Sequence, residues 1–162
     1  MTSLLAVLLP LLAMPCLLSL APPTSALPCL GEPVQWPVAF WCMAITGGVA
    51  TIAGVLDWRF HRVGGRRVPP AEHRAELAAL SLGVPLFALM ATASIVADPH
   101  PWLLPIVAVA LVMAGFIVFD ETRFHRACGT YETVLHRLLV GGNGIAFLAW
   151  LSWCFAQDSR AL

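Results

Sequence analysis

Four long apolar runs, separated by short polar stretches, dominate the chain from residue 34 onward. They cover residues 34–56, 77–97, 102–119 and 138–156. A helix needs about 20 apolar residues to cross the hydrocarbon core of a bilayer, and each run is close to that length. The pattern therefore predicts an all-α integral membrane protein with a bundle of four transmembrane helices.

A further hydrophobic segment precedes these runs. Residues 4–20 are apolar but contain Pro10 and Pro15, and the small residues Thr24 and Ala26 follow at a spacing that suits a signal-peptidase cut. The positively charged region that opens a signal peptide is missing. Two alternatives remain open, a cleaved signal-like segment and an uncleaved, proline-kinked fifth span. We therefore divide the chain into an N-terminal hydrophobic segment, 1–30, and a four-helix domain, 31–162.

Charged residues are few and unevenly placed. Only 11% of the 162 residues are charged, against about 25% in soluble proteins. Eight of the nine arginines lie in two windows, 59–74 and 123–137, which follow the first and third apolar runs. The positive-inside rule predicts that both windows face the cytoplasm of a bacterial-type inner membrane, with the 98–101 turn and the C-terminus outside. Because no basic domain is present, we expect no nucleic-acid partner.

Tryptophan positions agree with this orientation. Five of the six tryptophans lie near the predicted outer ends of the spans, namely Trp36, Trp41, Trp102, Trp150 and Trp153. Because tryptophan is enriched at the boundary between membrane and water, we expect these residues to form an interfacial belt.

The tetrapeptide Arg-Phe-His-Arg occurs twice, at residues 59–62 and 123–126, each time with an acid two positions upstream. Each copy ends an apolar run and is followed by a short turn and a helix that opens with an acid. We interpret this pattern as a duplicated helical hairpin, with repeats over residues 34–97 and 102–156. Two such hairpins can close into a bundle with a pseudo-twofold axis along the membrane normal.

Acids and histidines recur near the cytoplasmic end of all four predicted helices. An acid precedes a histidine by four residues in three of them, and a pair of glutamates stands at the matching place in the second helix. Residues four apart share one face of a helix, and carboxylates with imidazoles bind transition metals. We therefore predict a metal site with the ligands Asp57, His61, Glu72, Glu76, Glu121, His125, Glu132 and His136.

This ligand set resembles the ferritin-type di-iron arrangement in its residue types. That family uses a Glu-x-x-His step, whereas the spacing here is acid-x-x-x-His. The resemblance implies two bound metal ions, with iron as the first choice and zinc or manganese as alternatives. We expect redox or oxygen chemistry on a lipid-soluble substrate. The arginines of the two repeated motifs, Arg59, Arg62, Arg123 and Arg126, are expected to contact an anionic head group of a substrate or membrane lipid.

Other interpretations stay open, and so does the question of whether the protein is an enzyme. The acids and histidines could form only an ion-pair network at the helix ends. A b-type haem could be held by His61 with His125, or by His73 with His136. The small size also suits a non-enzymatic accessory or assembly subunit with a membrane-protein partner. Transport is disfavoured, because few polar side chains lie near the predicted midplane.

Overall fold

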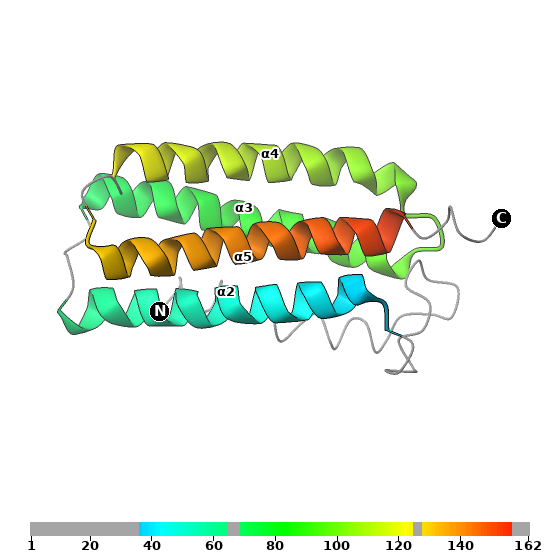
Figure 1. Ribbon diagram of the computed structural model, residues 1–162. Helices are drawn as coiled ribbons and strands as arrows, with labels where there is room; N and C mark the ends of the chain where they lie inside the picture. The colour runs from blue at the N-terminus through cyan, green and yellow to red at the C-terminus, as the bar shows by residue number, and fades with distance from the viewer. Residues whose placement is uncertain (1–35, 65–68, 125–127, 157–162) are drawn as a thin grey trace.

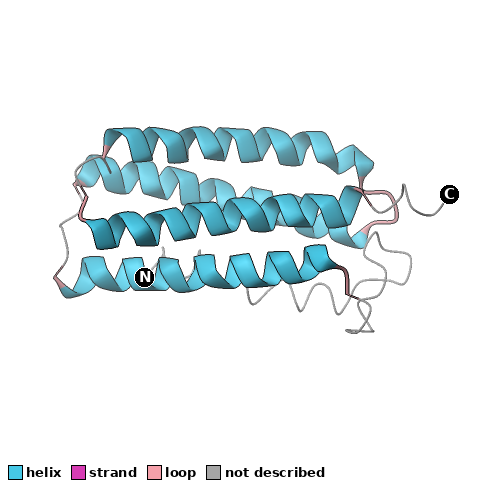
Figure 2. Ribbon diagram, in the orientation of Figure 1, coloured by secondary structure: helices cyan, strands magenta, loops and turns pink. Residues whose placement is uncertain are grey.

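The computed structural model describes residues 36–64, 69–124 and 128–156, and these ranges contain four helices and no strand (Figure 2). The helices are α2 (Val38–Val63), α3 (Pro70–Ile95), α4 (His100–Arg123) and α5 (Thr130–Phe155). Each is long and apolar enough to cross a membrane. The prediction of four such helices is therefore confirmed. The N-terminal hydrophobic segment, 1–30, lies outside the described residues.

Each helix extends beyond its apolar run into the charged sequence. Helix α2, for example, continues through Asp57 and His61 to Val63. A helix of 26 residues is about 39 Å long, whereas the hydrocarbon core of a bilayer is about 30 Å thick. Asp57, His61 and the other charged residues within the four helices are therefore held on helical turns, at defined angles around each axis.

The four helices lie side by side and alternate in direction (Figure 1). At one end of the bundle α2 and α4 finish and α3 and α5 begin. We call this the charged end, defined by Asp57, His61, Glu72, Glu76, Asp120, Glu121, Glu132 and His136. The opposite end, which holds Trp150 and Trp153, is called the aromatic end.

The helices pack in two close pairs, α2 along α5 and α3 along α4. Each pair combines one helix from each predicted hairpin. The predicted pseudo-twofold axis exchanges α2 with α4 and α3 with α5, so it would map one close pair onto the other. The observed packing is therefore compatible with the predicted symmetry, while the duplicated hairpin itself stays a prediction.

A glycine makes the closest contact between α2 and α5. A Cβ atom placed on Gly142 would lie 2.8 Å from the carbonyl oxygen of Thr46 and 3.0 Å from the Cβ of Ala50. Both distances are shorter than ordinary van der Waals contact, so any side chain at residue 142 would push the two helices apart. Small residues of this kind allow close approach of helices in membranes.

Several hydroxyl groups inside the helices donate hydrogen bonds to the backbone of their own helix. Thr46, Thr51 and Ser94 each donate to the carbonyl oxygen four residues earlier, at 2.7 to 2.8 Å. This pattern satisfies a polar group where no water is present. These hydroxyls therefore do not form a polar path through the bundle.

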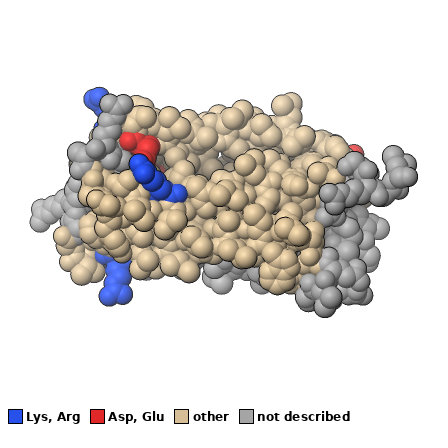
Figure 3. All heavy atoms as spheres, viewed as in Figure 1, with Lys and Arg blue, Asp and Glu red and all other residues tan. Residues whose placement is uncertain are grey.

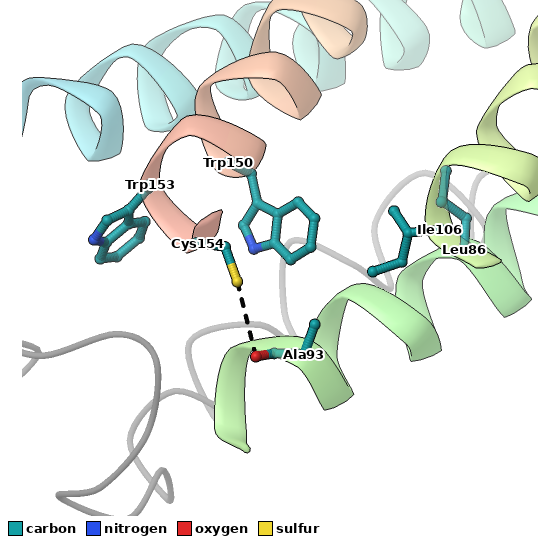
Figure 4. Close-up of a cluster of buried hydrophobic side chains, with 6 residues drawn as sticks. All are labelled: Leu86, Ala93, Ile106, Trp150, Trp153 and Cys154. Atoms are coloured by element: carbon teal, nitrogen blue, oxygen red, sulfur yellow. Dashed lines mark hydrogen bonds between the residues drawn. The ribbon is translucent and has the colours of Figure 1, made fainter. Parts of the chain in front are cut away.

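The aromatic end contains the largest buried side chains. Trp150 of α5 is 0% exposed and its indole N–H donates to the hydroxyl of Ser94 on α3 at 3.1 Å. Figure 4 shows Trp150 beside Leu86 and Ile106, and the thiol of Cys154 directed at the carbonyl oxygen of Ala93. This end of the bundle is closed by contacts between α3, α4 and α5.

The predicted tryptophan belt is wrong for two of its five members. Trp150 and Trp153 are fully buried in the core cluster and do not face outward. Their sequence positions near the helix ends are those of belt residues, but the face of α5 that carries them packs inward. Trp41, by contrast, is 49% exposed, as a belt residue should be.

Large apolar side chains cover the outside of the bundle. Leu104, Leu111 and Leu148 are each well over half exposed. Soluble proteins rarely expose contiguous apolar surface on this scale. The exposure is consistent with helices that contact lipid, and it leaves few positions inside the bundle for polar groups.

Candidate functional site

Ionisable side chains from all four helices meet at the charged end. On the face drawn in Figure 3, acidic and basic atoms lie mainly near the end where α4 finishes and α5 begins, and the surface between the two ends carries no charge. Three carboxylates of the charged end are nevertheless almost completely buried: Glu72 at 1% exposure, Glu132 at 3% and Asp120 at 4%.

The first contact joins α2 to α5. The Nε2 atom of His61 lies 3.5 Å from an Oε atom of Glu132 and 3.7 Å from an Oδ atom of Asp57. Asp57 and His61 stand one helical turn apart on α2, as their spacing predicted. The close packing of α2 along α5 brings Glu132 to the same imidazole.

The second group comes from the start of α3. Glu72 is the third residue of that helix and is directed into the bundle. Glu76, one turn later, is within electrostatic range of Asp120, Glu72 and His61. His73 lies at the exposed edge of this group, because its side chain is more than half exposed while its Nδ1 atom lies 3.6 Å from an Oε atom of Glu76.

The third contact joins α4 to α5. The Nε2 atom of His136 lies 3.1 Å from an Oε atom of Glu121. Together the three groups place seven of the eight predicted ligands at one end of the bundle. The eighth, His125, lies outside the described residues.

Asp120 was missed as a site residue, although it is more deeply buried than its neighbour Glu121. The prediction chose Glu121 because this residue precedes a histidine by the repeated spacing of four residues. A different signal in the sequence points to Asp120: it follows Ile106, Met113 and Ile117 at steps of seven, four and three, which is the spacing of one helix face. Ile106 is fully buried, so that face is the inner face of α4.

The two returning helices, α3 and α5, carry their first acid at equivalent places. Glu72 and Glu132 are each the third residue of the helix, and both are buried. Acids in a first turn are stabilised by the partial positive charge of the helix N-terminus. This effect lowers the free energy of an ionised carboxylate there but does not replace the hydration that burial removes.

The distances between acid and histidine atoms fit two neighbouring ligands of one metal ion. Ligand atoms about 2.1 Å from an ion are about 3.0 to 3.4 Å apart at octahedral or tetrahedral angles, and the two cross-helix pairs measure 3.1 and 3.5 Å. However, across residues 36–64, 69–124 and 128–156 no group of three acid, histidine or cysteine side chains is arranged as a ready metal site. The described candidate ligands therefore form acid–histidine pairs and not a complete coordination site.

The arginines of the repeated motifs lie on the outside of the charged end. Arg59, Arg62 and Arg123 are exposed, and the guanidinium of Arg62 stacks over Trp58 at 5.2 Å. Arg59 lines a shallow groove with Phe60 and Tyr131 between α2 and α5. Arg126 lies outside the described residues. The predicted contact of these arginines with an anionic head group stays a prediction.

The arrangement can stabilise cations or protons in a low-dielectric site. Carboxylates buried this close together cannot all be ionised unless positive charge compensates them. The described histidines of the group, His61 and His136, are two of the side chains that can supply such charge. Comparison of the chain with known proteins finds no matching family model, no similar curated protein and no similar solved structure.

Proposed function

We propose that the charged end binds two transition-metal ions in a membrane-embedded helical bundle and carries out redox or oxygen chemistry on a lipid-soluble substrate. Iron is the preferred metal, because carboxylate and imidazole ligands together suit iron and because dinuclear iron sites use this ligand chemistry in helical bundles. One ion would be held around His61, Asp57 and Glu132. The other would be held around His136 and Glu121, with Glu72, Glu76 and Asp120 available to bridge or complete the two sites.

The observation that carries the proposal is the burial of Glu72, Asp120 and Glu132 at one level of an otherwise apolar bundle. Carboxylates are rarely buried in proteins unless they are paired with other groups or coordinate a metal ion, and in helical membrane bundles they mark functional sites. A divalent metal ion provides compensating charge to several carboxylates at once.

Haem is supported less well than a dinuclear metal site. An axial haem ligand needs apolar space above its imidazole, but His61 and His136 both lie against carboxylates. His73 is exposed and paired with Glu76. A non-enzymatic accessory subunit remains the main alternative, in which the same acid–histidine contacts only join the helices.

Metal analysis of detergent-purified protein tests the proposal. We expect about two metal ions per chain after reconstitution with Fe(II) without oxygen. His61→Ala and His136→Ala should each remove at least one ion. His100→Ala is the matched control, because His100 is exposed at the other end of the bundle and pairs with Asp98.

If folded wild-type protein binds no iron, zinc or manganese after reconstitution, or if His61→Ala and His136→Ala bind as much metal as the control, then the charged end is an ion-pair network and the metal site does not exist. Circular dichroism of each variant shows whether the helices are intact, so that loss of metal is not confused with unfolding.

A further inference from the structure

We infer that the groove between α4 and α5 binds a single-chain amphipathic lipid, with the carboxylate of a fatty acid at Arg137 and the alkyl chain along the groove. This inference rests on the proposed function, because it names the substrate class of the same site. The groove has a volume of about 330 Å³ and is open to the outside of the bundle.

The groove exists because α4 and α5 are not a close pair. Each of these helices packs along another partner, α3 and α2 respectively. Gly141 adds to the opening, since a Cβ atom at this position would meet no other atom within 4 Å. Its neighbour Gly142 faces α2 and is tightly enclosed. The two adjacent glycines therefore serve different surfaces of α5.

The wall of the groove is almost entirely apolar. Ile117, Val118 and Val140 supply most of it. Thr122 also lines the groove, but its hydroxyl donates to the carbonyl oxygen of Val118 at 2.8 Å and so turns away from a ligand. This surface suits an alkyl chain and offers no hydrogen bond along its length.

Polar groups stand only at the charged end of the groove. The Glu121–His136 pair belongs to the proposed metal site, and its carboxylate and imidazole atoms lie 3.1 Å apart. Arg137 is exposed beside this pair, and none of the ion pairs among the described residues uses it. A guanidinium at the end of an apolar groove is complementary to a ligand with one anionic head and one apolar chain.

The size of the groove selects a single chain. Its volume lies at the low end of the range of about 300 to 1,000 Å³ found for small-molecule sites. A groove of this volume encloses one alkyl chain better than the two acyl chains of a phospholipid. A carboxylate held by Arg137 would place the first carbons of the chain next to Glu121 and His136, where the proposed metal chemistry takes place.

Spin-labelled stearic acid provides the test. Wild-type protein in phosphatidylcholine nanodiscs should show a saturable, motionally restricted population by electron paramagnetic resonance. Arg137→Gln should weaken binding about tenfold or more, because a charge-assisted hydrogen bond is lost. Gly141→Leu should abolish the restricted population by filling the groove. Arg74→Gln and Gly83→Leu are matched controls on α3, which does not line the groove.

The inference would be overturned by the absence of saturable binding, by equal binding in all variants, or by equal binding of spin-labelled two-chain phosphatidylcholine. Loss of binding in Arg137→Gln with full binding in Gly141→Leu would also overturn it, since attraction would then occur at the surface and not in the groove. If Gly141→Leu fails to fold, Gly141→Val serves in its place. Metal content is measured on the same samples. Metal-free protein that binds stearate contradicts only the proposed function, and metal-loaded protein that does not bind it contradicts only this inference.

Discussion

The two ends of the bundle are built from opposite kinds of side chain, yet both are buried. At the aromatic end, Trp150 and Trp153 fill the interior, and the indole N–H of Trp150 has its partner in Ser94. At the charged end, Glu72 and Glu132 are buried to the same degree, but their neighbours are other ionisable groups. Burial alone therefore does not distinguish a stabilising core from a functional one.

The difference lies in what each end contributes to folding. Lipid tails are as apolar as the core, so packing contacts and hydrogen bonds stabilise helix association in a membrane. The aromatic end provides both. The charged end removes carboxylates from water, which is unfavourable unless neighbouring positive charge, hydrogen bonds or protons compensate. We expect the aromatic end to hold the bundle together and the charged end to tolerate substitutions that reduce its charge.

Trp150→Ala should have the largest effect on stability. The substitution leaves a cavity between α3, α4 and α5 and removes the hydrogen bond to Ser94, so the free energy of unfolding should fall by about 3 kcal/mol. Unfolding of detergent-solubilised protein by added SDS measures the change. Trp41→Ala on the exposed surface is the control. An equal loss of stability in both variants would show that the aromatic end is not the main stabilising core.

Gly142→Ala should have the next largest effect on stability. Gly142 lies in the middle of α5, between the two ends of the bundle, where this helix contacts α2. The added methyl group would lie 2.8 Å from the carbonyl oxygen of Thr46, and overpacking of this kind costs about 1 to 3 kcal/mol. Gly141→Ala is a matched control one residue away, because its methyl group meets open space. The same SDS titration compares them. Equal stability of the two variants would contradict the close packing of α2 along α5.

Glu132→Gln should change the stability of the metal-free protein by about 1 kcal/mol or less, because glutamine keeps the shape of the side chain and can still form a hydrogen bond with His61. Metal binding should fall in the same variant. The contrast with Trp150→Ala would confirm that the two ends have different roles. A loss of about 3 kcal/mol in metal-free Glu132→Gln would instead assign the charged end a structural role.

The smallest effect is expected at Asp98, in the turn between α3 and α4. The backbone N–H of His100 donates a hydrogen bond to the Asp98 carboxylate at 3.0 Å, and the His100 imidazole lies at the same distance from it. The backbone hydrogen bond, together with the weaker effect of the imidazole, holds the pKa of Asp98 below its ordinary value. A carboxyl with a lowered pKa in the folded state contributes stability above its unfolded pKa. That contribution disappears as the pH falls through the lower, folded pKa.

Titration of the Asp98 carboxyl by carbon NMR measures this shift directly. His100→Ala keeps the backbone N–H but removes the imidazole, so the pKa of Asp98 should rise only part of the way to its ordinary value. A midpoint at the ordinary value in wild-type protein would contradict the capping contact. Because Asp98 is exposed, the associated change in stability should be small compared with the other three predictions.

The sequence predicted the helices well because length and apolar composition are local properties. It also predicted that acids and histidines would meet at one end, since their spacing places them at the same level of each helix. The sequence pattern did not reveal which side of α5 packs inward. Trp150 and Trp153 have the position of interfacial residues, and only their contacts with α2 and α3 show that they are buried. Asp120 was overlooked for the same reason, although the stripe that leads from Ile106 to it could have identified the inner face of α4.

The pairing of α2 with α5 has a consequence for the assembly of the protein. In the proposed membrane protein the helices would enter the bilayer in the order of synthesis, so α3 could pack along α4 as soon as both are inserted. Helix α2 must wait for α5, and until then Asp57 and His61 lack the helix that supplies Glu132 and His136. The proposed metal site should therefore form only at the last step of insertion, and a nascent chain stalled before α5 should not take up metal.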